Sequence, residues 1–199
     1  MVTNAYTIFW THDRYNTLRR LGWAGRQMQT LFGGPHISEP SFTRAGVCPG
    51  DLIYPITVRS GVLYVLGRAR VRCMLTLDNY IEQHSDLFSL DRSEPLAKTK
   101  AFDRYRIAHP AVASLAPTCT DEVVECEEST LLRFDLAIPP DLLTRLRYRS
   151  QRRERDLSQH LRDGRLVRSV AVQGIYRLSE PSACELEALV LGTNMPTKV

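Results

Sequence analysis

Aromatic residues and one arginine in the first third of the chain have the clearest chemical meaning in this sequence. The aromatic residues fall on predicted strands, and a long irregular loop between these strands carries Trp23 and Arg26. Aromatic rings that form a cage can sandwich a nucleobase, and a nearby amide or hydroxyl can then read its edge. The alternative is that Phe9, Tyr54 and at least one tryptophan fill the hydrophobic core. The aromatic residues in question are Tyr6, Phe9, Trp10, Tyr54 and Tyr64.

Arginine supplies almost all of the positive charge. The formal net charge is +4, and the only lysines are Lys98, Lys100 and Lys198. Arginine suits bidentate contacts to phosphate, so a nucleic-acid backbone is a candidate partner. The alternatives are a solvated charged face braced by Glu154 and Asp156, and the arginine bias of a GC-rich genome. The candidates for backbone contacts are Arg68, Arg70, Arg145, Arg147, Arg149, Arg152 and Arg153.

The cysteines and the missing catalytic signatures point away from a metal or cofactor enzyme. The five cysteines are odd in number and scattered, which favours the reducing cytoplasm. Cys119, Cys126 and His109 match no standard zinc spacing, so we expect no metal and no cofactor. The sequence has no glycine-rich phosphate loop, no His-Glu-x-x-His and no Gly-x-Ser-x-Gly. We therefore expect a binding module rather than an enzyme, with an unrecognised hydrolase or nuclease as the alternative.

The elements that must position these side chains centre on a predicted β-hairpin. Apolar residues alternate with other residues along 52–58 and again along 63–73, and Ser60-Gly61 separates the two runs. Pro55 indicates an edge or a bulge, and Gly67 indicates a bulge or a close backbone approach. Arginines take the face opposite the apolar one on the second run, so the hairpin has a core face and a charged face.

The whole chain, residues 1–199, is predicted to form one α+β domain. A length of 199 residues with 43% hydrophobic residues suits a single domain with a substantial core. No apolar run is long enough to cross a bilayer, and the start of the chain has no secretion signal. The tract at 89–129 is predicted to be an irregular insertion that carries short strands or a helix, and the acidic run at its end is expected to be a solvated surface. The other predicted elements are a strand at 5–11, a helix at 12–21, a loop at 22–46, a helix at 76–88 capped by Thr76, a strand at 130–138, a helix from 141 through 161, a strand at 172–179 and a helix at 180–191.

Several short segments, taken together in chain order, resemble the PUA-like superfamily. These segments are Trp23-Ala24-Gly25-Arg26, Gly50-Asp51, Leu66-Gly67-Arg68-Ala69-Arg70-Val71 and Arg177-Leu178-Ser179. Within that superfamily they are similar to the EVE and ASCH branches, which are related to YTH domains. The resemblance implies a small mixed β-barrel of about five to six strands with flanking helices.

The same resemblance implies a nucleic-acid-binding function. Members of the superfamily bind RNA or DNA, and EVE and YTH members often recognise a modified base. The base pocket is expected between the first strand, the loop after it and the central hairpin. Two alternatives stay open: an ASCH-like hydrolase or ribonuclease that acts on RNA or a nucleoside-like amide, and a protein-interaction module. The pocket residues that the resemblance implies are Trp10, Thr11, Trp23, Arg26, Tyr54, Pro55 and Thr57.

Overall fold

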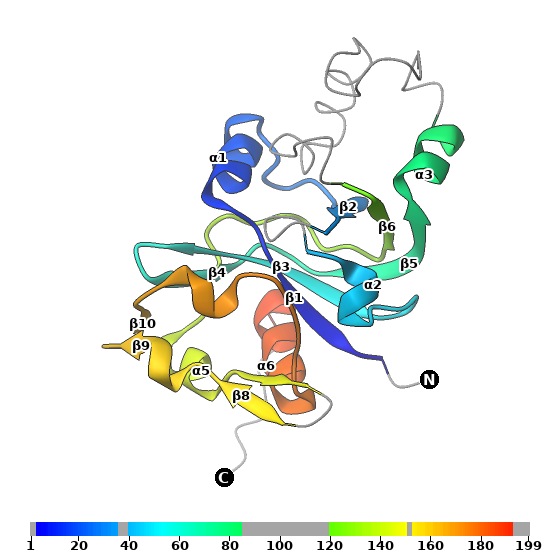
Figure 1. The fold of residues 1–199 in the computed structure, drawn as a ribbon. Helices are drawn as coiled ribbons and strands as arrows, with labels where there is room; N and C mark the ends of the chain where they lie inside the picture. The colour runs from blue at the N-terminus through cyan, green and yellow to red at the C-terminus, as the bar shows by residue number, and fades with distance from the viewer. Residues whose placement is uncertain (1–2, 36–39, 85–119, 151–152, 193–199) are drawn as a thin grey trace.

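A mixed β-sheet forms the centre of the molecule in the computed structural model, which describes residues 3–35, 40–84, 120–150 and 153–192 (Figure 1). Its strands are β1 (Ala5–Phe9), β2 (Thr30–Gly33), β3 (Leu52–Arg59), β4 (Val62–Val65), β5 (Ala69–Thr76), β6 (Glu122–Glu127) and β11 (Ile175–Arg177). They are hydrogen-bonded in the order β11–β1–β3–β5–β6–β2, and β4 pairs with the second half of β3. β1 runs parallel to β3, and the other pairs are antiparallel.

Helices and short hairpins pack on this sheet. The helices are α1 (His12–Arg20), α2 (Phe42–Ala45), α3 (Leu77–Gln83), α5 (Pro140–Arg145) and α6 (Glu180–Leu191). The short strands are β7 (Arg147–Arg149), β8 (Glu154–Asp156), β9 (Leu161–Arg162) and β10 (Arg165–Leu166), and two 3-10 turns are η4 (Ser158–His160) and η5 (Ser169–Val172). Figure 1 shows α1 above β3, and α5, α6 and the β7–β8 hairpin below it. No helix in the described ranges is long and apolar enough to cross a membrane.

Two hydrophobic clusters lie on the two sides of the sheet. Successive side chains of a strand point to opposite faces, and β3 follows this rule. Ile53 packs in a first cluster that contains Trp10 and Tyr15, whereas Tyr54 and Ile56 pack in a second cluster below the sheet. The side of the sheet that a residue faces therefore decides which surface it can help to build.

The predicted α+β class is confirmed, but the predicted closed barrel is not formed by the described strands. The two outer strands of the sheet are β11, which pairs with β1, and β2, which pairs with β6. They stand at opposite ends of the strand order. No ladder joins them within the described ranges, so the described sheet is an open path of strands.

The central hairpin is confirmed at the predicted turn. Ser60 and Gly61 have φ angles of 48° and 79°, which suits a tight two-residue turn, and Arg59 pairs with Val62 across it. The chain then leaves the strand around Gly67, where an added Cβ would lie 3.2 Å from the Thr130 hydroxyl oxygen. The prediction of a close backbone approach at this glycine is therefore confirmed. The break at Gly67 divides the second predicted run into β4 and β5.

The acidic run that we predicted to be solvated is in fact strand β6, between β5 and β2. Val123 and Val124 are fully buried, and three of the acidic side chains, Glu122, Glu125 and Glu128, have hydrogen-bond or ion-pair partners. The Glu122 carboxylate accepts hydrogen bonds from the Ser41 hydroxyl and the Phe42 N–H at the start of α2, both at 2.7 Å. The strand predicted at 130–138 is instead an irregular segment that makes only isolated bridges in the described structure.

The basic segment that we predicted to be helical forms a hairpin. α5 ends at Arg145, and Leu146 already has extended backbone angles (φ −59°, ψ 126°). Leu146 and Tyr148 are buried, whereas Arg149 is exposed, so burial follows the two-residue period of a strand. The chain therefore continues as β7 and returns as β8.

The other local predictions have mixed outcomes. The helix at 12–21 is confirmed as α1, and Thr76 caps α3 by accepting a hydrogen bond from the Asn79 N–H at 3.2 Å. The last helix is confirmed as α6, which Gly192 ends in the left-handed conformation. The loop predicted at 22–46 is wrong in part, because it contains β2 and α2. Most of the predicted insertion, residues 85–119, lies outside the described residues.

Candidate functional site

An open groove of about 870 Å³ lies between α1, the loop that follows it, the β3–β4 hairpin and the segment 131–135. Two backbone hydrogen bonds hold the loop against that segment: the Gly25 N–H donates to the Leu132 carbonyl at 2.9 Å, and the Leu132 N–H donates to the Arg26 carbonyl at 2.8 Å. The residues that line the groove are Tyr15, Arg19, Ala24, Gly25, Arg59, Tyr64, Leu131, Leu132, Arg133, Phe134 and Asp135.

Tyr15 lies directly beneath the groove and is fully buried. Its hydroxyl donates to the Phe134 carbonyl at 3.0 Å and accepts from Arg59 Nη1 at 2.8 Å. Its ring meets the Phe134 ring edge to face, with centroids 5.3 Å apart. α1 carries Tyr15, β3 carries Arg59, and the 131–135 segment carries Phe134, so this one phenol joins all three walls.

Two arginines of the groove, Arg19 and Arg59, lie over the buried Tyr15 ring and have no carboxylate partner in the described ranges. The guanidinium carbon of Arg59 lies 4.8 Å from the centroid of the Tyr15 ring, and that of Arg19 lies 5.7 Å from it. Within the described ranges neither forms an ion pair, whereas Arg133 lies 3.3 Å from Asp135. Three arginines and one aspartate line the groove, so its described walls carry excess positive charge.

None of the seven residues predicted for the base pocket lines this groove. Trp10, Tyr54, Pro55 and Thr57 are buried in the interior, because β1 and β3 are central strands covered on both faces. They build the frame instead: the Thr57 hydroxyl donates to the Trp10 carbonyl at 2.9 Å, which ties β3 to the end of β1. Thr11 caps α1 by accepting from the Arg14 N–H at 3.3 Å.

The loop residues Trp23 and Arg26 come closest to the predicted role. Trp23 is half-buried against the first core cluster, and the Arg26 guanidinium lies 5.2 Å from the centre of its ring. The two residues between them, Ala24 and Gly25, line the groove. The predicted loop is therefore at the groove, but it contributes backbone and a methyl group rather than the indole and the guanidinium.

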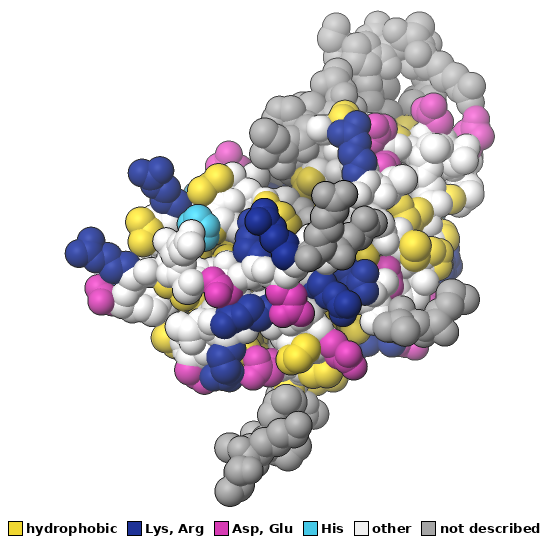
Figure 2. Space-filling view, turned by 60° about the horizontal axis from the view of Figure 1, so that its bottom comes forward, with side chains coloured by type: hydrophobic (Ala, Val, Ile, Leu, Met, Phe, Trp, Pro, Cys, Tyr) yellow, Lys and Arg dark blue, Asp and Glu magenta, His cyan; other side chains and the backbone are white. Residues whose placement is uncertain are grey.

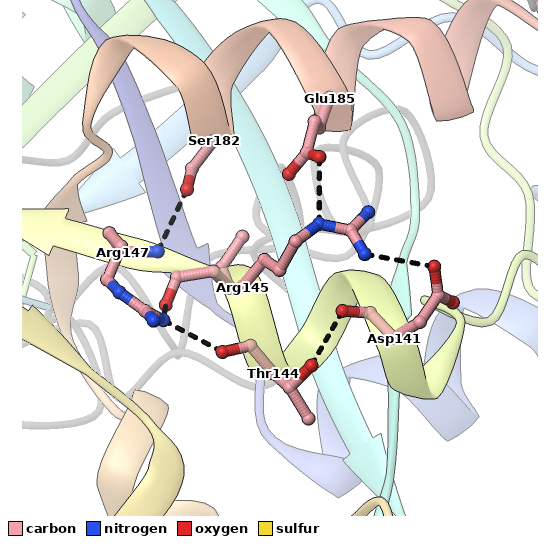
Figure 3. A network of polar contacts seen from close by, with 7 residues as sticks. Asp141, Thr144, Arg145, Arg147, Ser182 and Glu185 are labelled. Carbon is pink, nitrogen blue, oxygen red and sulfur yellow. Dashed lines mark hydrogen bonds and ion pairs between the residues drawn. The ribbon is translucent and has the colours of Figure 1, made fainter. Parts of the chain in front are cut away.

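Four of the arginines predicted to contact a nucleic-acid backbone instead bind other groups of this chain. Arg68 is largely buried and lies 3.6 Å from Glu187, and Arg70 lies 2.9 Å from Glu128. Arg145 donates to a carboxylate oxygen of Asp141 and one of Glu185, as Figure 3 shows. Arg147 donates to two carbonyl oxygens at the end of α5. The exceptions, Arg149 and Arg153, are exposed, and Arg152 lies outside the described residues.

The network in Figure 3 explains why this basic segment folds as it does. Arg145 clamps α5 to α6, with hydrogen bonds of 3.2 Å to Asp141 and 3.1 Å to Glu185. Two residues further along, the Arg147 N–H donates to the Ser182 hydroxyl at 2.9 Å. These contacts fix the end of α5 against α6 and start β7, so the charges of this part of the segment stabilise the fold.

A second polar cluster surrounds the Glu125 carboxylate on β6. The carboxylate accepts a hydrogen bond from the Cys73 thiol at 3.1 Å and lies 3.5 Å from His84 Nε2. It also forms an ion pair with Arg72. Burial and the neighbouring carboxylate raise the pKa of the Cys73 thiol, which disfavours the reactive thiolate. Among the described side chains, no group of three His, Cys, Asp or Glu residues could hold a metal ion. We therefore assign this cluster to stability.

Sequence reasoning missed Tyr15, Arg19, Arg59 and Phe134. A usable signal was the spacing of Tyr15 and Arg19, which places both on one face of a helix. Phe134 and Tyr15 are 119 residues apart and meet only through the folded chain, so no local pattern indicates that contact.

The comparisons with known proteins give a structural likeness only. No protein-family model and no curated protein matches the chain. Structural neighbours are crystal structures of ASCH from Zymomonas mobilis and of two of its mutants. They are 11% identical in sequence, with TM-scores of 0.36 to 0.37, and the matches cover 93% of this chain and 94% to 97% of theirs. These TM-scores are too low to support a shared function, and the predicted resemblance to EVE and YTH domains stays a prediction.

Proposed function

We propose that the chain binds single-stranded nucleic acid, RNA or DNA, through the groove over Tyr15. One observation carries the proposal: two arginines without a carboxylate partner in the described ranges, Arg19 and Arg59, line the same groove as the half-buried aromatic rings of Phe134 and Tyr64. A nucleotide presents both things that this arrangement suits, a negative phosphate and a flat apolar base. A base must be unpaired to enter the groove, which is why we propose a single-stranded ligand.

The positioning of Arg59 supports a phosphate contact. A guanidinium has five N–H donors in a fixed fork, and the hydrogen bond to Tyr15 uses one of them. The stacking on the Tyr15 ring and this bond hold the group in one orientation before a ligand arrives. Less side-chain entropy is then lost on binding, so a pre-oriented arginine binds phosphate more tightly than a free one.

The apolar walls of the groove support a base or sugar contact. Leu131 is 53% exposed at the rim, and Phe134 and Tyr64 are half-buried. A volume of about 870 Å³ is in the range of pockets that hold small ligands, and it is large enough for a nucleotide. A base that rests against these residues would displace water from apolar surface.

The proposal is tested by measuring binding of single-stranded RNA, single-stranded DNA and a duplex of the same sequence by fluorescence anisotropy. We expect the single strands to bind more tightly than the duplex, and Arg59→Gln to weaken binding roughly tenfold, because a charge-assisted hydrogen bond is lost. Arg20→Gln is the control, since Arg20 is exposed at the end of α1, next to Arg19, and does not line the groove. Equal affinity of the Arg59 variant and the unsubstituted protein would contradict the proposal.

The same experiment covers the finer expectations. Oligonucleotides with modified bases show whether the groove prefers a modification, and electrophoresis of the recovered oligonucleotide shows whether the protein cleaves it. Cleavage that disappears in the Arg59 variant would favour the alternative of a ribonuclease acting in the same groove. If no oligonucleotide binds and a partner protein co-purifies, the alternative of a protein-interaction module is favoured.

A further inference from the structure

A second cleft, of about 250 Å³, lies below the sheet where the β7–β8 hairpin meets β11. It shares no lining residue with the groove over Tyr15. Four of its seven lining residues are arginines, and none of the described residues that line it carries a carboxylate. The residues that line the cleft are Tyr148, Arg149, Ser150, Arg153, Arg155, Tyr176 and Arg177.

The topology brings these residues together from separate strands. Tyr148 on β7 pairs with Arg155 on β8 and forms an isolated bridge with Leu178, directly after β11. This bridge places Arg149 beside Arg177, and both also line the neighbouring cleft at the start of α6. The hairpin turn is closed by Ser150, whose hydroxyl donates to the Arg153 carbonyl at 2.9 Å. The arginines are thus held by backbone pairing.

The Arg155 guanidinium lies against two tyrosine rings that also contact each other. Its guanidinium carbon lies 4.4 Å from the centroid of the Tyr176 ring and 5.4 Å from that of Tyr148, and the two rings are 5.4 Å apart. Its Nη2 donates to the Ala171 carbonyl at 3.3 Å. Burial raises the pKa of the Tyr148 hydroxyl to about 12, so the phenol stays neutral beside the guanidinium. The remaining N–H groups of Arg155 are left for another acceptor.

The arginines of this cleft have no direct carboxylate partner in the described part of the chain, although Glu180 and Glu187 line the neighbouring cleft with Arg149 and Arg177. None of its four arginines forms an ion pair there, in contrast to Arg70 and Arg145. Glu154 is the cross-strand partner of Arg149 in the hairpin, but the two side chains form no ion pair. Figure 2 shows this side of the molecule, where arginine side chains are spread over the surface with acidic side chains between them. The cleft itself is lined by four arginines and by no described carboxylate.

We infer that this cleft binds a phosphate group. Its volume of about 250 Å³ is small for a base with its sugar but sufficient for a phosphate. Guanidinium forks bind phosphate oxygens bidentately, and Arg155 is already oriented by its two rings. The inference goes beyond the proposed function, because the cleft lies on other elements and an inorganic anion alone can test it. The phosphate can come from the backbone of a nucleic acid or from its 5′ end.

Isothermal titration with inorganic phosphate and pyrophosphate tests the cleft directly. We expect saturable binding to the unsubstituted protein, and a loss of roughly tenfold in affinity in Arg177→Gln, because a charge-assisted contact is removed. Arg177 is exposed, so this variant should fold normally. Arg165→Gln on β10 is the matched control, since Arg165 is also exposed and lies outside the cleft. No saturable binding, or unchanged binding in Arg177→Gln, would overturn the inference.

Two further arms identify the source of the phosphate and separate this inference from the groove. A 5′-phosphorylated oligonucleotide that binds more tightly than its 5′-hydroxyl form assigns the cleft to a terminal phosphate. Equal binding of the two forms, with a loss in Arg177→Gln, assigns it to the backbone. Arg59→Gln should leave binding of inorganic phosphate to the cleft unchanged. If only Arg59→Gln weakens oligonucleotide binding and no variant affects phosphate, the cleft fails while the groove stands.

Discussion

At the residue scale, the Tyr15 hydroxyl decides how Arg59 is presented to a ligand. Tyr15 is fully buried. Its hydroxyl donates a hydrogen bond to the Phe134 carbonyl and accepts one from the Arg59 guanidinium. A phenylalanine at this position would keep the ring but leave both partners without this bond. The hydroxyl therefore links the stability of the groove to its charge.

Tyr15→Phe should lower the free energy of unfolding by about 2 kcal/mol, because two hydrogen bonds are lost and each contributes about 1 kcal/mol net. It should also weaken oligonucleotide binding, but less than Arg59→Gln, because the charge remains. Urea unfolding and anisotropy measure the two effects. Tyr64→Phe is the control: Tyr64 lines the same groove, and its hydroxyl makes no hydrogen bond within the described ranges. Equal effects of the two variants would show that the Tyr15 hydroxyl has no special role.

Glu125 gives the chain a defined response to acid. Burial alone would raise the pKa of its carboxyl, but the hydrogen bonds from Arg72, Cys73 and His84 outweigh burial and lower it. A carboxyl whose pKa is lower in the folded state stabilises the fold above its ordinary pKa, and this stabilisation is lost as the pH falls through the folded value.

Glu125→Gln should therefore lower stability at neutral pH, and the difference from the unsubstituted protein should shrink as the pH falls below about 4.5. Thermal unfolding as a function of pH measures this. Glu127→Gln serves as the control, since Glu127 is exposed on the same strand. A stability difference that stays constant down to low pH would show that the ionised carboxylate is not the stabilising form.

At the scale of elements, α1 positions the groove and depends on its cap. Thr11 caps the helix, which carries Tyr15 and Arg19 on one face. The backbone of Trp10, directly before the cap, is bound to β3 on both sides: its N–H donates to the Ile56 carbonyl, and its carbonyl accepts from the Thr57 hydroxyl. The start of the helix is thus fixed to the same strand that ends in Arg59.

Thr11→Ala should cost about 1 kcal/mol of stability through loss of the cap, and it should also weaken oligonucleotide binding slightly, because the first turn of α1 loosens. Thr76→Ala removes the same kind of cap from α3, which contributes no residue to the groove. It should cause a similar loss of stability and no change in affinity. If both variants weaken binding equally, the effect comes from general destabilisation rather than from α1.

Much of the framework could be predicted from local sequence, whereas the site could not. The turn at Ser60-Gly61, the cap at Thr76 and the C-terminal helix each depend on a few adjacent residues. β6 was missed because its acidic residues outnumber its valines, although Glu122 caps α2 and Glu125 is paired. The groove depends on the parallel pairing of β1 with β3 and on the 131–135 segment, which are long-range contacts.

The β7–β8 hairpin shows a different limit of local prediction. Its strands are three residues long, so the two-residue period of burial is too short to oppose a helical reading. The contacts that end the helix come from α6, through Ser182 and Glu185. Tertiary contacts therefore overrode local helical preference here.

At the scale of the whole molecule, a modest net charge of +4 is distributed unevenly. Several arginines that looked available in sequence are neutralised by carboxylates, among them Arg68, Arg70 and Arg145. Uncompensated charge collects at the groove above the sheet and at the cleft below it. Since they share no residue, substitutions in one should leave binding at the other nearly unchanged.

The most direct test of the central claim is the salt dependence of single-strand binding in the double variant Arg19→Gln/Arg59→Gln. Each phosphate contact to a single strand contributes about 0.7 to the slope of log affinity against log salt concentration. We predict that the double variant binds more weakly and that its slope is smaller by about 1.4, while Arg20→Gln keeps the slope of the unsubstituted protein. An unchanged slope in the double variant would contradict the claim that nucleic acid binds in the groove over Tyr15.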